Sequence, residues 1–344
     1  MKKIIITTLL LLPTLSLSTA SHAAENAFAI AIHGGAGTIN KAKMTTEKRA
    51  AYEKKLSEAI DAGYQLLSDG HSSQEAIIAA IKIMEDSPLF NAGKGAVYTF
   101  EGTHELDASI MDGKTLNAGA VSGVKTVKSP ITLAQQVMDK SVHVMLSGEG
   151  AETFAKEQGL TLVDNSYFDT PHRYQSLLKA KEKLKKAMKN NNYQAAHQSL
   201  PTEYKVGTVG AVALDKAGNL AAGTSTGGMT AKRYGRIGDA PIIGAGTYAN
   251  NASCAVSATG HGEYFIRYHV AADICARVQY QQKSLSEAAD TVINKVLVNA
   301  GGTGGVIAID TKGNIAMPFN TSGMYRASKS STGESFMGIF KNEE

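Results

Sequence analysis

The chain has 344 residues, of which 35 are basic and 31 acidic, so its formal net charge is +4. Loss of Lys2 and Lys3 with a leader peptide would leave 33 of the 35 basic residues and a charge of +2. This balance argues against nucleic acid or an anionic membrane as a partner, and the length suffices for a large core in one two-part domain.

The N-terminus has the three-part layout of a secretory signal. Lys2 and Lys3 precede an apolar run from Ile4 to Leu17, and small residues follow. This run is short for a membrane-spanning helix, and no later stretch approaches the ~20 apolar residues that such a helix needs. We therefore expect residues 1–23 to be a signal peptide, cleaved after Ala23, and the mature protein to be soluble and periplasmic or secreted.

Strand-like and helix-like segments alternate along the rest of the chain. Strands are indicated by β-branched, apolar runs between Gly, Asn or Asp, and helices by apolar residues three to four positions apart. The predicted elements are, in chain order, a strand at 28–32, helices at 46–67 and 73–85, a strand at 118–124, helices at 132–138 and 149–158, strands at 209–214 and 220–224, helices at 263–278 and 284–298, and strands at 306–309 and 315–318.

Two of the strand pairs share one turn pattern, VALDKAGNLA at 212–221 and VIAIDTKGNIA at 306–316. In each, an Asp begins the turn and a Gly-Asn pair ends it, with the Gly able to adopt the positive φ of a tight reversal. Both are predicted to be β-hairpins. Part of the sheet is therefore antiparallel, which argues against an all-parallel doubly wound fold.

Residues 164–206 have the composition of an exposed linker. Within them KAKEKLKKAMK at 179–189 carries six lysines, and we interpret it as a solvated helix in preference to a binding patch. Residues 207–262 are, by contrast, dense in Gly, Thr, Ser and Ala. The passage from a polar linker to a buried strand that starts with Thr suits a cut between Gly207 and Thr208.

Cys254 and Cys275 are the only cysteines, too few for a disulfide scaffold in a chain of this length. We interpret them as buried thiols, although an oxidising compartment would permit one bridge.

A pattern of α/β-hydrolases is also present. Gly223–Gly227 fits their nucleophile elbow, and HGGAG at 33–37 would be the oxyanion loop. The elbow must lead into a helix, whereas loop-forming residues follow here. Asp239 and either His261 or His269 would complete the triad, too soon after the serine for the usual intervening elements.

Phosphate and metal sites are weakly indicated. No Gly-rich segment ends in Gly-Lys-Ser or Gly-Lys-Thr, as a P-loop requires. The pairs His104–Glu105 and His261–Glu263 are isolated, and we interpret them as hydrogen-bonding groups.

A series of longer motifs covers nearly the whole chain after the leader. They are HGGAG at 33–37, SPLFNAGKGAV at 87–97, HELDASIMDG at 104–113, GTVGAVALD at 207–215, STGGMT at 225–230, GRIGD at 235–239 and TGHGE at 259–263. In this order they resemble the plant-type asparaginase and isoaspartyl peptidase family of N-terminal-nucleophile hydrolases. The resemblance implies an α+β fold, a four-layer αββα sandwich. It also implies a precursor that splits into an α chain of 24–207 and a β chain of 208–344, with two copies of each in an (αβ)₂ heterotetramer.

The chemistry explains why a cut before Thr208 would matter. A threonine hydroxyl is a weak nucleophile, and a free α-amine on the same residue can act as its base, because that amine titrates near ~7.7–8.0. Self-cleavage would begin with attack of the Thr208 hydroxyl on the Gly207 carbonyl, and water would then open the resulting ester. Gly207 has no Cβ, so it leaves room for the attack and tolerates a strained backbone.

The resemblance assigns further residues to catalysis. Thr226 would hydrogen-bond the nucleophile, and Thr259 and the backbone amide of Gly260 would be the oxyanion donors.

Substrate binding is assigned in the same way. Arg236 would hold the substrate α-carboxylate in a two-bond fork and Asp239 the α-ammonium, although a local salt bridge between the two is the alternative. The backbone of Gly262 would lie close to the amine. Asn91 falls on an active-site position of the family, and it could equally cap a turn.

The family often holds a structural sodium ion in the loop that matches 84–94. The implied ligands are the backbone oxygens of Met84, Glu85, Ser87, Phe90, Ala92 and Lys94. Lys94 stands where an apolar residue is more usual, but a carbonyl ligand does not depend on its side chain. The chemistry itself requires no cofactor.

The expected activity is hydrolysis of β-aspartyl dipeptides and L-asparagine to L-aspartate plus an amino acid or ammonia. A glycosylasparaginase is the nearest alternative, but such enzymes usually carry Asp where this chain has Gly207. A taspase-like endopeptidase is a further alternative. A periplasmic amino-acid-binding protein would differ from all of these in remaining uncut.

Overall fold

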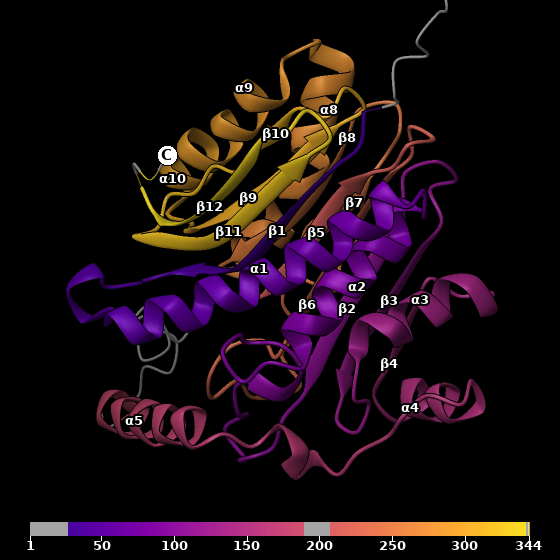
Figure 1. The fold of residues 1–344 in the computed structure, drawn as a ribbon. Helices are drawn as coiled ribbons and strands as arrows, with labels where there is room; N and C mark the ends of the chain where they lie inside the picture. The colour runs from indigo at the N-terminus through magenta and orange to yellow at the C-terminus, as the bar shows by residue number, and fades with distance from the viewer. Residues whose placement is uncertain (1–26, 189–206, 342, 344) are drawn as a thin grey trace, which may run out of the picture.

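Two stacked β-sheets lie between two layers of helices (Figure 1). The computed structural model describes residues 27–188, 207–341 and 343. The larger sheet has the strand order β12 (Ser335–Phe340), β11 (Gly323–Ser330), β1 (Ala29–Gly37), β5 (Val209–Leu214), β6 (Leu220–Thr226), β2 (Leu106–Asp112), β3 (Ala118–Val124) and β4 (Met145–Ser147). The smaller has the order β10 (Ile315–Ala316), β9 (Gly304–Asp310), β8 (Cys254–Gly260) and β7 (Thr247–Ala249). Only β3 and β4 pair in parallel among these strands.

Helices cover the outer face of each sheet. The larger sheet is covered by α1 (Thr46–Ser68), α2 (Ser73–Glu85) and α3 (Pro130–Lys140), and the smaller by α8 (Val270–Gln281), α9 (Leu285–Asp290), a π-helical turn (Thr291–Val296) and α10 (Leu297–Ala300). The remaining helices are α4 (Gly148–Glu157), α5 (Pro171–Met188) and α7 (Gly262–Arg267), with short 3-10 turns at Lys41–Lys43, Gly93–Gly95 and Asn165–Phe168. The predicted αββα sandwich is therefore confirmed.

Side-chain alternation along the central strands builds this sandwich. In β1, Ile30 and Ile32 point to the helical side, whereas Ala29 and Ala31 pack against the second sheet. Small residues on the inner face let the two sheets approach closely. On the helical side, α2 begins with a capping box in which Ser72 and Glu75 exchange hydrogen bonds.

Both predicted hairpins are confirmed. β5 pairs with β6 and β9 with β10, each antiparallel. Asp215 and Asp310 accept backbone N–H groups of their own turns, and Gly218 and Gly313 have φ values of 79° and 82°. These turn residues fix the register of the strands that follow.

Several elements differ from the sequence prediction. The single helix expected at 263–278 is two helices, α7 and α8, separated by His269 at φ 47°. The linker expected at 164–206 is in part a docked helix, because Leu177, Ala180 and Leu184 of α5 are buried. Residues 189–206 and the expected signal peptide lie outside the described residues.

Cys254 and Cys275 form a disulfide that joins β8 to α8. The interpretation of two free buried thiols is therefore wrong. In the part of the chain that the structure describes, no helix has the length and apolar character needed to cross a membrane.

Candidate active site

Thr208 lies at the start of the central strand β5, and its side chain faces its own preceding carbonyl. The Thr208 hydroxyl is 2.7 Å from the Gly207 oxygen and 3.3 Å from the Thr226 hydroxyl, and only 7% of Thr208 is exposed. Gly207 has φ 127°, a conformation that favours glycine. Antiparallel pairing of β5 with β6 brings Thr226 beside Thr208 from 18 residues away.

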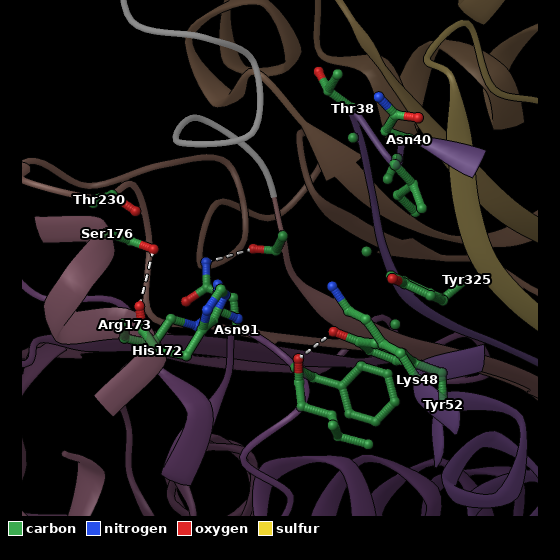
Figure 2. A pocket seen from close by; sticks show the side chains of 18 of the residues that line it. Thr38, Asn40, Lys48, Tyr52, Asn91, His172, Arg173, Ser176, Thr230 and Tyr325 are labelled. Atoms are coloured by element: carbon green, nitrogen blue, oxygen red, sulfur yellow. Dashed lines mark hydrogen bonds between the residues drawn. The ribbon is translucent and has the colours of Figure 1, made fainter. Parts of the chain in front are cut away.

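Three donors converge on the Gly207 carbonyl oxygen. Besides Thr208, they are the Asn91 amide nitrogen at 2.9 Å and the Thr226 hydroxyl at 3.1 Å. Asn91 is held in place because its Nδ2 also donates to Gly228 O and its Oδ1 accepts from Val97 N. Figure 2 shows the Asn91 side chain directed at this carbonyl, and the dashed line marks the bond. The arrangement can stabilise negative charge on that oxygen.

The end of β1 passes directly beside the Gly207–Thr208 bond. The pairing of β1 with β11 shifts register between His33 and Ala36, which is a β-bulge. A Cβ on Gly35, whose φ is 105°, would lie 3.1 Å from Thr208 N. Gly35 of the HGGAG motif therefore allows the backbone of β1 to approach the backbone of Thr208 closely.

His33 supports the backbone of Thr208, a role that the sequence reasoning missed. Its Nδ1 lies 3.1 Å from Thr208 O and its Nε2 lies 3.0 Å from Ser257 Oγ. Complete burial lowers the pKa of His33 to about 3, so the ring is neutral. The only available sequence signal was its place in the HGGAG motif.

Thr259 and Gly260 end β8 in the second sheet, next to the same bulge. The buried Thr259 hydroxyl accepts a hydrogen bond from Ala36 N at 3.1 Å. The two sheets therefore both contribute residues near Thr208, as a sandwich allows where strands of each sheet end together.

A charged cluster lies where Gly262, at the start of α7, meets the loop after β6. A Cβ on Gly262 would be 2.8 Å from Asp239 Oδ1 and 2.9 Å from Arg236 Nη2, so only glycine fits. Arg236 donates two hydrogen bonds to Glu263, each of 3.0 Å. The alternative of a local salt bridge to Asp239 is thus replaced by a pair with Glu263, which the sequence reasoning did not consider.

Asp239 is unusual in this cluster. It is buried, and its Oδ2 has no hydrogen-bond partner among the described residues. Burial raises the pKa of Asp239 to about 7, although Arg236 opposes this effect. A buried carboxylate oxygen without a donor can accept a cationic ligand.

The competing sites do not form. Ser225 lies inside β6, where its hydroxyl donates to Glu85 at 2.6 Å, and β6 leads into a loop. The α/β-hydrolase elbow is therefore excluded. His104 hydrogen-bonds Val97 O and Asp169, as interpreted from sequence. The described residues include no group of three His, Cys, Asp or Glu that could hold a metal ion.

Comparison with known proteins decides the family. The chain matches the family described as asparaginase over residues 26–339. It belongs to the asparaginase family. Members are hydrolases of the N-terminal-nucleophile fold, and their chemistry needs no cofactor.

Curated relatives in this asparaginase family are similar over most of their length. An isoaspartyl peptidase of Salmonella typhimurium is 51% identical over 88% of this chain and 95% of its own. The isoaspartyl peptidase of Escherichia coli is 50% identical over 87% and 91%. A putative isoaspartyl peptidase/L-asparaginase of Dictyostelium discoideum is 45% identical over 86% and 92%.

The prediction of a periplasmic or secreted asparaginase is wrong. Relatives from bacteria, an amoeba, a plant and an animal all carry the plain name of isoaspartyl peptidase or isoaspartyl peptidase/L-asparaginase. Most of these organisms have no periplasm, so membership of the family gives no ground for export. The residues on which the prediction depended lie outside those that the structure describes.

Proposed function

We propose that this protein is an autocatalytically cleaved threonine hydrolase that releases L-aspartate from β-aspartyl dipeptides and L-asparagine. The observation that carries the proposal is the convergence of Thr208, Thr226 and Asn91 on the Gly207 carbonyl. The names of the relatives support the substrate class.

Self-cleavage starts with the Thr208 oxygen attacking the Gly207 carbonyl carbon. Asn91 Nδ2 and the Thr226 hydroxyl stabilise the resulting oxyanion, since both already donate to that oxygen. The C–N bond then breaks, the Thr208 nitrogen takes the proton of the hydroxyl, and an ester remains. Water hydrolyses this ester to a Gly207 carboxylate and a free Thr208 hydroxyl. The φ of 127° at Gly207 is readily adopted by glycine, so this residue lets the chain present its carbonyl to the Thr208 hydroxyl.

The freed Thr208 amine then serves as the base for its own hydroxyl. The hydroxyl attacks the side-chain carbonyl of the substrate, and the Thr259 hydroxyl and Gly260 N–H stabilise the oxyanion. The leaving amine or ammonia takes the proton. Water opens the aspartyl ester and restores Thr208, so the cycle needs no metal or cofactor.

The charged cluster binds the aspartyl head group. Arg236 takes the α-carboxylate, and the unpaired oxygen of Asp239 accepts the α-ammonium next to Gly262. Glu263 keeps Arg236 oriented until the substrate arrives.

The mature protein consists of an α chain that ends at Gly207 and a β chain of 208–344, assembled as (αβ)₂. The loop at 84–94 has the character of a sodium site. A Cβ on Gly93 would meet Glu85 O, and one on Gly95 would meet Phe90 O, so both glycines let the loop fold tightly around its own backbone oxygens. Carbonyl oxygens suit a hard cation, which would stabilise the loop that carries Asn91.

Denaturing electrophoresis of purified protein tests the proposal. We expect two fragments, and N-terminal sequencing of the smaller one should begin Thr-Val-Gly-Ala. Cleavage at this bond is expected because the Thr208 hydroxyl lies 2.7 Å from the Gly207 carbonyl oxygen. A fully active preparation that runs as one full-length band would contradict the proposal, and an inactive, uncut protein that binds an amino acid would support a binding protein.

The pH profile of asparagine hydrolysis should report Asp239. Asp239 must be ionised to hold the substrate ammonium, and its pKa of about 7 leaves it protonated in acid. The Thr208 amine must also be neutral. Below about pH 6, log kcat/KM should therefore rise with a slope of about 2, whereas Asp239→Asn should show a slope of about 1 and a lower rate. Equal slopes would show that Asp239 does not titrate in the substrate site.

A further inference from the structure

A cavity of about 330 Å³ opens beside the Gly207–Thr208 junction. Gly207 and Asn91 are part of its wall. The remaining wall comes from the end of β1 and the segment that follows it, from α1, α5 and β11, from the loop before Asn91 and from Thr230. Arg236, Asp239 and Gly262 do not line it. The cavity therefore adjoins the proposed reacting centre on a different side from the proposed head-group site.

The rim of this cavity is strongly basic. Lys48 of α1 and His172, Arg173 and Lys179 of α5 line it, and the described lining residues include no Asp or Glu. Figure 2 shows Lys48 on one side of the space near Asn91, and His172 and Arg173 on the other. Burial together with Arg173, Lys48 and Lys179 lowers the pKa of His172, so these charges act on one another.

Arg173 is the cation best placed to hold a ligand. Its Nε donates to Gly95 O at 2.8 Å, and neither Nη atom donates to a described residue. One bond thus fixes the guanidinium while its outer nitrogens stay available. A gathering of like charges without a carboxylate is unfavourable by itself and attracts an anion.

The opposite wall is aromatic. Tyr52 stacks on Tyr325 with ring centroids 4.1 Å apart, and Phe90 meets Tyr52 edge-on at 5.6 Å. Tyr52 is also held by a hydrogen bond from its hydroxyl to Leu89 O. A rigid apolar wall that faces a cationic rim matches an amino acid with an apolar side chain and a free carboxylate.

We propose that this cavity binds the leaving residue of β-aspartyl dipeptides. Arg173 and Lys48 hold the carboxylate of the second residue, and its side chain packs on Tyr52 and the edge of Tyr325, behind which Phe90 lies buried. The inference rests on the proposed function and adds a specificity site to it. Asparagine has no second residue and cannot use the cavity, so dipeptides with Leu or Phe should be favoured, and those with Lys or Arg disfavoured by the basic rim.

Removal of the charge on Arg173 or Lys48, or on the substrate carboxylate, tests this site. Processed wild type, Arg173→Met and Lys48→Met are assayed with β-Asp-Leu, its C-terminal amide and asparagine. The ratio of kcat/KM for β-Asp-Leu to that for asparagine should fall about 10-fold in Arg173→Met and by less in Lys48→Met. Wild type should lose a similar factor on the amide. Arg173→Met should lose nothing further on the amide, because the two changes remove one interaction.

Lys156→Met is the matched control, since Lys156 is an exposed lysine of α4 outside the cavity, and its ratio should equal that of wild type. Lys48 is also exposed, so its variant reports binding even if Arg173→Met folds poorly. Unchanged ratios in both variants would overturn the inference. An equal loss on all three substrates would also overturn it and would favour the chain's own Gly207 carboxylate as the occupant. Wild type that hydrolyses none of the substrates would instead defeat the proposed function.

Discussion

Thr208→Ala should remain a single full-length chain and should hydrolyse neither asparagine nor β-aspartyl dipeptides. The substitution removes the oxygen that lies 2.7 Å from the Gly207 carbonyl oxygen. It therefore removes the nucleophile of both reactions, and the α-amine base is never freed. Loss of a nucleophile in other hydrolases costs on the order of 10⁶ in kcat, so activity should fall below detection. Electrophoresis, intact mass and an ammonia-release assay measure the result.

Thr208→Ser is the matched variant, because it keeps the hydroxyl and loses only a methyl group. It should still cut itself, more slowly, since the less restricted hydroxyl spends less time facing the carbonyl. Hydroxylamine added during cleavage should trap the ester and leave a hydroxamate on Gly207. A Thr208→Ala chain that is nevertheless cut at this bond would disprove attack by the side chain. The melting temperature of Thr208→Ala checks that this variant is folded. If it is unfolded, the cleavage rate of Thr208→Ser tests the role of the hydroxyl instead.

Local patterns in the sequence predicted the elements that local physics determines. The strands at 118–124 and 209–214 and the helix at 73–85 have the predicted bounds, because apolar periodicity and the capping residue Ser72 act within one element. β8 and β11 were not predicted. Cys254–Gly260 is built of small residues, and Gly323–Ser330 carries Arg326 and Lys329, so only their neighbours in the sheets make them strands.

In the candidate site, too, some residues could be predicted from the sequence and others could not. Thr208 and Gly207 stand out in the sequence because a linker meets a strand there. The pair of Arg236 with Glu263 and the support of Thr208 by His33 do not, since each joins residues that only the folded chain brings together. The basic cavity combines α1, α5 and Gly207 for the same reason. The roles of Thr226, Thr259 and the other assigned residues stay predictions.

Arg236→Ala should separate self-cleavage from substrate turnover. Arg236 bonds to Glu263 in the head-group cluster, and none of its hydrogen bonds reaches Gly207, Thr208 or Asn91. The variant should therefore cut itself as the wild type does. Its kcat/KM for asparagine should fall roughly 100- to 1000-fold, or about 3 to 4 kcal/mol, because the substrate carboxylate would be buried without its partner.

Arg267→Ala is the matched control for this variant, because Arg267 is exposed at the end of the same helix that carries Glu263. It should both cleave and turn over substrate normally. Arg236→Lys keeps the charge but loses the fork, so its kcat/KM should lie between those of wild type and Arg236→Ala. Normal turnover by Arg236→Ala would refute its binding role. Without the guanidinium, the carboxylates of Asp239 and Glu263 would repel each other and could disturb their surroundings. Failure of Arg236→Ala to cleave would therefore mean that the charged cluster also supports the Gly207–Thr208 junction.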